Sequence, residues 1–246
     1  MKKHLILFFI TLSVHVFAQK EYYELRKYDI PFNAAEASLH HYLETAFIPA
    51  LNRLGINNIG VFEAYGAPTP KQVFLLIPFK NLAAYEQAIQ ELPKDSVYLN
   101  ARKSYDALPP IQKVYDRFTT SFLVAFEGFP KLIKPNFKAN LFELRTYEGA
   151  NEYAVQRKVK MFNTEEFAIF EATGLHSVFF GEQLSGPLMP ALTYLLAFES
   201  MEERDANWAK FSVHPEWKRV SALKEYANSV SDIKRTFLKP LSYSQL

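Results

Sequence analysis

The sequence contains no cysteine, few glycines and only two tryptophans among its 246 residues. Without cysteine the chain can form no disulfide and no thiolate metal site, so its stability has to come from packing. It also lacks a phosphate-binding glycine loop, a Gly-x-Ser-x-Gly turn and a clustered histidine set, which disfavours nucleotide hydrolysis, thiol catalysis and serine hydrolysis. No stretch after the first 18 residues is long and apolar enough to span a membrane.

The N-terminus has the pattern of a secretory signal. Two lysines precede an apolar run from Leu5 to Phe17, and the small residue Ala18 follows. The run is shorter than the roughly 20 residues that a spanning helix needs, so we predict cleavage after Ala18 rather than a signal anchor. Export would place the mature chain in the periplasm or outside the cell.

Cleavage changes how the charge is interpreted. Lys plus Arg falls from 28 to 26, which equals the 26 Asp plus Glu, so the mature chain is close to neutral. A nucleic-acid binder would carry a basic surface, and none is indicated. The basic run Arg157 to Lys160 is interpreted as the solvated face of a helix.

What the sequence does contain is a repeat. Residues 22–28 return 119 residues later as residues 141–147, with Glu, Leu, Arg and Tyr in the same places. The same offset aligns several further positions: Thr45 with Thr164, Gly55 with Gly174, Glu63 with Glu182, Pro68 with Pro187, Leu76 with Leu195, Phe79 with Phe198 and Tyr98 with Trp217.

Each copy shows the pattern strand, helix, strand, strand, helix, strand, which predicts an α+β ferredoxin-like unit. Pro49 should kink or interrupt the first helix, and Gly55 and Gly174 should end the two equivalent helices. We expect the two sheets to pack face to face within one chain.

The predicted segments are a signal peptide at 1–18, a first unit at 19–127, a linker at 128–139 and a second unit at 140–246. The predicted strands run over 22–29, 56–65, 73–79 and 114–126 in the first unit and 141–147, 175–182, 192–198 and 233–241 in the second, with the later helices starting near 81 and 200.

The opening strand of each unit carries the candidate site. Strand alternation puts Glu, Arg and Tyr on one face and apolar residues on the other. We expect the apolar pair Phe142 and Leu144 to meet the helices and the polar side chains to converge between the sheets. There they would either pair as a structural Glu–Arg cluster or form a cavity in which Arg binds an anion and Tyr donates a hydrogen bond. The candidate ligand-binding residues are Glu24, Arg26, Tyr28, Glu143, Arg145, Tyr147, His214 and Trp217.

The histidines give weaker signals. His40 and Glu44 are one helical turn apart, but two such residues do not make a metal site, and a solvated helix face is the simpler interpretation. His176 follows a helix-ending glycine and is interpreted as a strand-entry residue. His214 could cap a helix, order a loop or border a binding site. We predict no metal and no cofactor. Trp208, Phe211 and Trp217 have roughly helical spacing and are expected in the core.

The ordered set of motifs resembles the NIPSNAP family. It comprises the Glu-Leu-Arg-x-Tyr strands, residues 198–200, Trp208 and the run His214-Pro215-Glu216-Trp217-Lys218. The resemblance is fuller in the second copy, from about 140 to 241, because the first copy lacks the Trp and His-Pro-Glu-Trp elements. It implies a dimeric α/β-barrel fold but little chemistry. Eukaryotic members are associated with mitochondria and vesicle traffic. Because a secretory signal does not fit that location, we do not expect the same cellular role for this chain.

Three function classes remain open from the sequence. The first is a binding module for a small, partly apolar ligand or for an envelope protein partner. The second is a cofactor-independent enzyme, monooxygenase- or isomerase-like, with its site between the sheets; this rests on fold analogy. The third is a purely structural pseudo-dimer, and a homodimer of tandem units is also possible.

Overall fold

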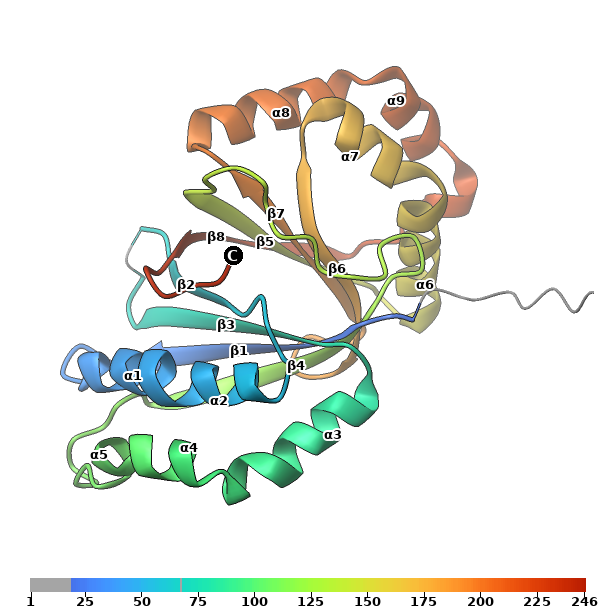
Figure 1. Cartoon of the computed structure of the whole chain (residues 1–246). Helices are drawn as coiled ribbons and strands as arrows, with labels where there is room; N and C mark the ends of the chain where they lie inside the picture. Colours follow the sequence, from blue (N-terminus) through green and yellow to red (C-terminus); the bar gives the residue numbers. More distant parts are fainter. Residues whose placement is uncertain (1–18, 67) are drawn as a thin grey trace, which may run out of the picture.

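The computed structural model describes residues 19–66 and 68–246, so the predicted signal peptide lies outside the described residues. The described chain contains two strand-helix-strand-strand-helix-strand units that follow one another in the sequence (Figure 1). The strands of the first unit are β1 (Tyr22–Ile30), β2 (Gly60–Ala64), β3 (Lys71–Phe79) and β4 (Arg117–Ala125), and those of the second are β5 (Leu141–Glu148), β6 (His176–Ser185), β7 (Ala191–Phe198) and β8 (Asp232–Pro240).

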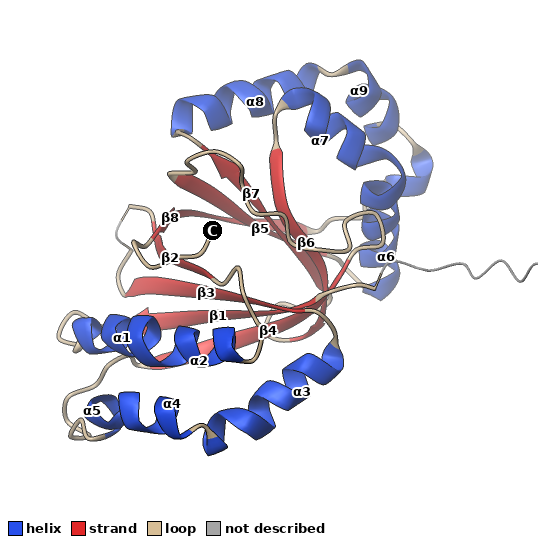
Figure 2. Ribbon diagram, in the orientation of Figure 1, coloured by secondary structure: helices blue, strands red, loops and turns tan. Residues whose placement is uncertain are grey.

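The helices of each unit cover the outer face of its own four strands (Figure 2). In the first unit they are α1 (Glu36–Tyr42), the π-helical turn η1 (Leu43–Phe47), α2 (Ile48–Arg53), α3 (Leu82–Glu91), the 3-10 turn η2 (Leu92–Lys94), α4 (Ser96–Ala101) and α5 (Lys103–Asp106). In the second unit they are α6 (Glu152–Met161), the π-helical turn η3 (Phe162–Glu166), α7 (Phe167–Thr173), α8 (Met201–Val213), α9 (Pro215–Ser221) and the 3-10 turn η4 (Lys224–Tyr226).

The eight strands close into one barrel in the order β1-β3-β2-β8-β5-β7-β6-β4. Each unit contributes a ferredoxin-like sheet, and the sheets join edge to edge through β2 with β8 and β4 with β6, all antiparallel. Closure removes the free sheet edges that two separate units would leave. The predicted α+β fold of two tandem units is therefore confirmed, as an intramolecular dimeric α/β barrel.

The repeat offset is visible in the helix geometry. The π-helical turns start at Leu43 and Phe162, which are 119 residues apart in the sequence. Gly55 and Gly174 both adopt left-handed backbone with φ of 79° and 74°, as predicted for residues that end a helix. The helix irregularity does not come from Pro49 as predicted, because the second unit has the same π turn with Ala168 at the equivalent place.

The inside of the barrel is filled by apolar side chains. The rings of Tyr23 and Phe179 pack there at a tilted angle with centroids 4.9 Å apart, and neither residue is accessible to solvent. Packing is so close that a Cβ added to Gly181 would lie 2.8 Å from Cβ of Leu123. The other buried members of this interior cluster are Phe62, Ala64, Phe74, Leu76, Ala125, Phe142, Leu144, Val178, Leu195, Ala197 and Leu238.

The prediction about strand faces was wrong. Phe142 and Leu144 point into the barrel, and the polar side chains of β5 point outward to the helices. Both faces of these strands are buried, so alternation separates the faces without telling which one meets the helices. The middle of the barrel interior is apolar, whereas side chains of α8 pair with the charged groups on the outer face of β5. Among the described residues, apolar side chains occupy the space between the sheets, and the polar residues of β5 predicted to converge there lie on the outer face instead.

Within residues 19–66 and 68–246, no helix combines the length and the apolarity that crossing a membrane requires.

The interior packing generates a stability prediction. Phe179→Ala should cost about 3–5 kcal/mol of unfolding free energy, because a rigid barrel interior cannot collapse around the cavity. Phe32→Ala is the matched control, since Phe32 is fully exposed and its loss should change stability by less than about 0.5 kcal/mol. Urea denaturation of both variants measures this. Equal midpoints for the two would contradict the filled barrel.

Candidate functional site

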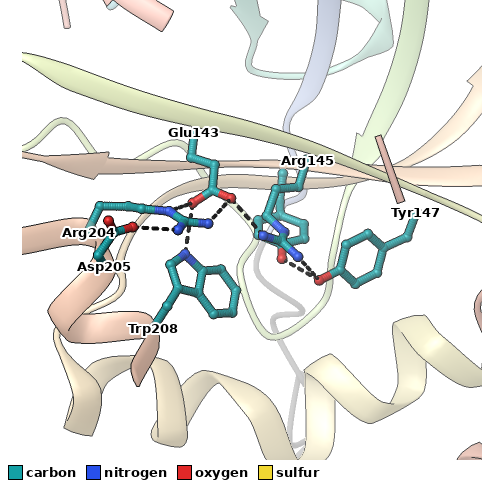
Figure 3. A network of polar contacts seen from close by, with 7 residues as sticks. Glu143, Arg145, Tyr147, Arg204, Asp205 and Trp208 are labelled. Carbon is teal, nitrogen blue, oxygen red and sulfur yellow. Dashed lines mark hydrogen bonds and ion pairs between the residues drawn. The ribbon is translucent and has the colours of Figure 1, made fainter. Parts of the chain in front are cut away.

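A carboxylate on β5 is the centre of the polar cluster on the second unit (Figure 3). Arg204 of α8 donates two hydrogen bonds to Glu143, from Nε to Oε2 at 2.9 Å and from Nη2 to Oε1 at 3.0 Å. Trp208 Nε1 donates to Oε2 at 2.8 Å, and Arg145 Nη1 donates to Oε1 at 2.6 Å. These four bonds attach α8 to the strand and fix the Arg145 guanidinium.

The surroundings of Glu143 favour its charged form. Its side chain has no exposed surface, and burial alone would raise its pKa. Hydrogen bonds and charge from Arg204 and Arg145 outweigh burial and hold the pKa of Glu143 below its ordinary value. A carboxylate that is ionised at neutral pH is therefore available to orient both arginines.

The arginine connects this cluster to two tyrosines. Arg145 Nη2 donates to the hydroxyl of Tyr147 at 3.1 Å, which lies 2.8 Å from the hydroxyl of Tyr194. The guanidinium carbon lies 4.4 Å from the ring centroid of Trp208. Two of the five N–H groups of Arg145 are used, and its buried Nε has no partner within the described part of the chain.

A second buried ion pair lies nearby. Lys158 of α6 donates to Oε1 of Glu166, on the π turn η3, and both residues are at most 5% exposed. The Lys158 ammonium also lies 4.7 Å from the ring centroid of Phe162. The interpretation of residues 157–160 as a solvated helix face is therefore wrong for Lys158, which points into the unit.

A cavity of about 480 Å³ joins these groups between the outer face of the second sheet and its helices. Such a volume is typical of small-molecule sites. Its walls combine polar groups from the strand and α6 with aromatic residues from α7, α8 and α9. The lining residues are Arg145, Tyr147, Lys158, Met161, Glu166, Phe170, Trp208, Phe211, Ser212, Trp217, Ser221, Tyr226, Asn228, Ser229, Val230 and Ile233.

The equivalent region of the first unit is filled. Arg26 pairs with Glu24 as its counterpart does, but its guanidinium carbon lies 4.9 Å from the ring centroid of Phe47. Phe47 occupies the position of Glu166 at the repeat offset, and Leu39 occupies that of Lys158. Both are buried in the apolar core of the first unit. The two units thus share a strand motif, but in the described part of the first unit apolar side chains stand where Lys158 and Glu166 border the cavity.

The structure brings only some of the predicted site residues together. Glu143, Arg145, Tyr147 and Trp217 meet at or beside the cavity, while Glu24, Arg26 and Tyr28 form a separate cluster under the helices of the first unit. The predicted pairing of Glu with Arg is confirmed in both copies, but each pair lies within one strand and does not join the two halves.

The histidines lie away from the cavity. His214 is the N-cap of α9 and makes no capping bond with its side chain, and its buried Nδ1 has no partner among the described residues. His176 lies 3.4 Å from Glu203, and His40 contacts Glu36 and Tyr243 rather than Glu44. Across the described ranges, no three His, Asp or Glu side chains are grouped as metal ligands would be.

Sequence reasoning missed Lys158, Glu166, Tyr194 and Arg204 as residues of the site, and it expected Trp208 in the core, although Trp208 donates to Glu143 and lines the cavity. A signal for two of them was present. At the repeat offset Lys158 and Glu166 replace Leu39 and Phe47, so a charged pair stands where the sister copy is apolar. Nothing comparable marks Tyr194 or Arg204.

Glu143→Gln should destabilise the protein by about 3–5 kcal/mol, because two arginines lose their buried counter-charge. Glu24→Gln is the matched control and should lower the unfolding free energy less, since Glu24 pairs with Arg26 alone.

The stabilisation by Glu143 should also depend on pH. Because the folded-state pKa of Glu143 is lowered, its contribution to the unfolding free energy is present above the unfolded pKa of about 4.3 and is lost as pH falls through the folded value. Urea melts from pH 7 to pH 3 should show the gap between wild type and Glu143→Gln closing with acid. A gap independent of pH would contradict this.

Comparisons with known proteins identify the fold and the family. A protein from Lactobacillus acidophilus described as a "putative monooxygenase" is 11% identical, with a TM-score of 0.59, and the match covers 90% of this chain and 94% of that one. A second protein with the same description, from Fusobacterium nucleatum, is 8% identical with a TM-score of 0.57 over 91% of this chain and 93% of its own. At these identities the likeness shows a shared fold.

A NIPSNAP family protein of unknown function from Agrobacterium tumefaciens is 21% identical, with a TM-score of 0.38, over 44% of this chain and 94% of its own. No curated protein sequence matches. The NIPSNAP family model matches twice, over residues 23–124 and 142–245, and together these ranges span most of the chain. The chain is therefore a member of the NIPSNAP family, with two tandem NIPSNAP units in one closed barrel.

Proposed function

We propose that this protein binds a small, partly apolar molecule in the cavity of its second unit, through one anionic or strongly hydrogen-bond-accepting oxygen group. The observation that carries the proposal is the cavity itself, which brings the oriented guanidinium of Arg145 together with aromatic walls from Trp208 and Trp217. This is the arrangement expected of a ligand pocket, mostly apolar with a few convergent polar groups.

The charge of the cavity supports an anionic group. Glu143 is already paired with Arg204 and Trp208, and Glu166 with Lys158. The guanidinium of Arg145 has three N–H groups beyond its bonds to Glu143 and Tyr147. A carboxylate or enolate oxygen placed beside it would gain charge-assisted hydrogen bonds without displacing an existing ion pair.

The aromatic walls support an apolar, ring-shaped body. Phe170, Phe211 and Trp208 contact one another edge to face beside the cavity. Trp217 packs on Phe211 with tilted rings whose centroids are 4.5 Å apart. Rings of this kind stack on a planar ligand and exclude water from its polar end. The rim carries Ser212, Ser221 and Asn228, which are exposed and polar.

The setting is part of the same proposal. The signal pattern of residues 1–18 supports an exported protein, periplasmic or extracellular, that meets its ligand outside the cytoplasm. We also propose units at 19–127 and 140–246 with the linker 128–139 between them. Since two NIPSNAP units already complete a barrel, the fold does not need a second chain.

An enzyme is the second candidate, because a buried carboxyl faces the cavity. Glu166 is 2% exposed, and burial raises its pKa despite the charge of Lys158. A carboxyl with a raised pKa in a cavity is a candidate general acid or base. The neighbours described as monooxygenases support this only by analogy of fold.

Isothermal titration calorimetry of the mature chain with benzoate, phenylacetate and 2-naphthoate tests the binding proposal. We expect one site per chain, because Leu39 and Phe47 occupy the equivalent positions in the core of the first unit. Arg145→Met should weaken binding by about tenfold to a hundredfold, since a hydrogen bond to a charged group contributes about 1.5–3 kcal/mol.

Arg26→Met is the matched control, from the same strand position of the filled unit, and should leave affinity unchanged. Thermal melting establishes that both variants fold. Two equal sites per chain, or a folded Arg145→Met variant with unchanged affinity, would contradict the proposal.

A further inference from the structure

The buried pair of Lys158 and Glu166 is not required by the fold. The first unit has the same helix, the same π turn and the same strands, and it places Leu39 and Phe47 at the two positions. Both are at most 4% exposed. The same two positions of the fold are thus occupied by apolar residues in the first unit and by a buried ion pair in the second.

The ionic solution is the less favourable one for stability. Two charges lose their hydration on burial, and replacing a buried ion pair with well-packed apolar residues is often neutral or stabilising. The fold does not need this charged pair, and the pair lies in the wall of the cavity. Its position therefore indicates a functional role in that cavity.

The geometry suits proton transfer. Lys158 donates to Oε1 of Glu166 and to Sδ of Met161, and among the described residues Oε2 of Glu166 makes no hydrogen bond. Glu166 and Arg145 line the same cavity, close enough for the arginine's charge to act on the carboxyl. A carboxylate base and a group that stabilises negative oxygen are thus available to one small molecule.

We infer that the second unit catalyses proton transfer at the carbon next to a ketone, with aryl-substituted 2-oxo acids as the substrate class. Glu166 takes a proton from that carbon, the C–H electron pair forms the C=C bond, and the carbonyl π electrons move to oxygen. Arg145 and Tyr147 stabilise the resulting enolate oxygen by hydrogen bonds. Return of the proton to carbon or to oxygen completes keto–enol exchange without a cofactor or co-reactant. The inference rests on the proposed function of the same cavity.

Deuterium exchange at the carbon next to the ketone tests this, followed by proton NMR in D₂O with phenylpyruvate and indole-3-pyruvate as probes. We expect the mature chain to accelerate exchange over buffer by at least about 100-fold. Glu166→Gln should reduce exchange to the buffer rate while the probe still binds. Glu165→Gln is the matched control, because the neighbouring carboxylate bonds Arg219 and lies outside the cavity, so it should exchange like wild type.

Because Glu166→Gln leaves Lys158 unpaired, a second variant keeps the test decisive. Lys158→Leu combined with Glu166→Phe installs the residues of the first unit, and it should fold with undiminished stability and show no exchange above buffer. Exchange retained by either variant would overturn the inference. Probes that bind without exchange would overturn it and leave the binding proposal standing. Failure of both the 2-oxo acids and the aryl carboxylates to bind would overturn both.

Discussion

Closure of the barrel is the constraint on which the rest of this structure depends. Once eight strands form a closed ring, the middle of its interior is filled by apolar groups such as Tyr23 and Phe179. The charged residues Glu143 and Arg145 of β5 lie on the outer face, beneath the helices. There Glu143 accepts three hydrogen bonds from Arg204 and Trp208 of α8, and these bonds position the helix that forms one wall of the cavity.

The duplication shows which parts of the unit serve folding. Both copies have the Glu-x-Arg-x-Tyr strand, a π-helical turn and a helix ended by glycine, so these features belong to the shared framework. The copies differ where function is proposed. Phe47 packs under Arg26 in the first unit, whereas Glu166 leaves space beside Arg145 in the second. A single ligand site per chain follows from that difference.

Much of the fold could be predicted because it follows local patterns. The repeat offset, the strand order within each unit, the glycine caps and the helix starts at Asn81 and Ser200 are all encoded in short stretches of sequence. The orientation of the strand faces was predicted wrongly, because β5 is buried on both sides and alternation is symmetric in that case. Site residues such as Tyr194 and Arg204 depend on contacts across strands and helices, which no spacing in the sequence reports.

The two tryptophans of the sequence, Trp208 and Trp217, both line the cavity, so tryptophan fluorescence reports on this site and on no other part of the protein. Titration of the mature chain with an aryl carboxylate, followed by tryptophan emission, therefore tests the location of the site directly. We predict a saturable change in emission whose midpoint equals the dissociation constant from calorimetry. Calorimetric binding with no change in tryptophan emission would place the ligand elsewhere and contradict the account.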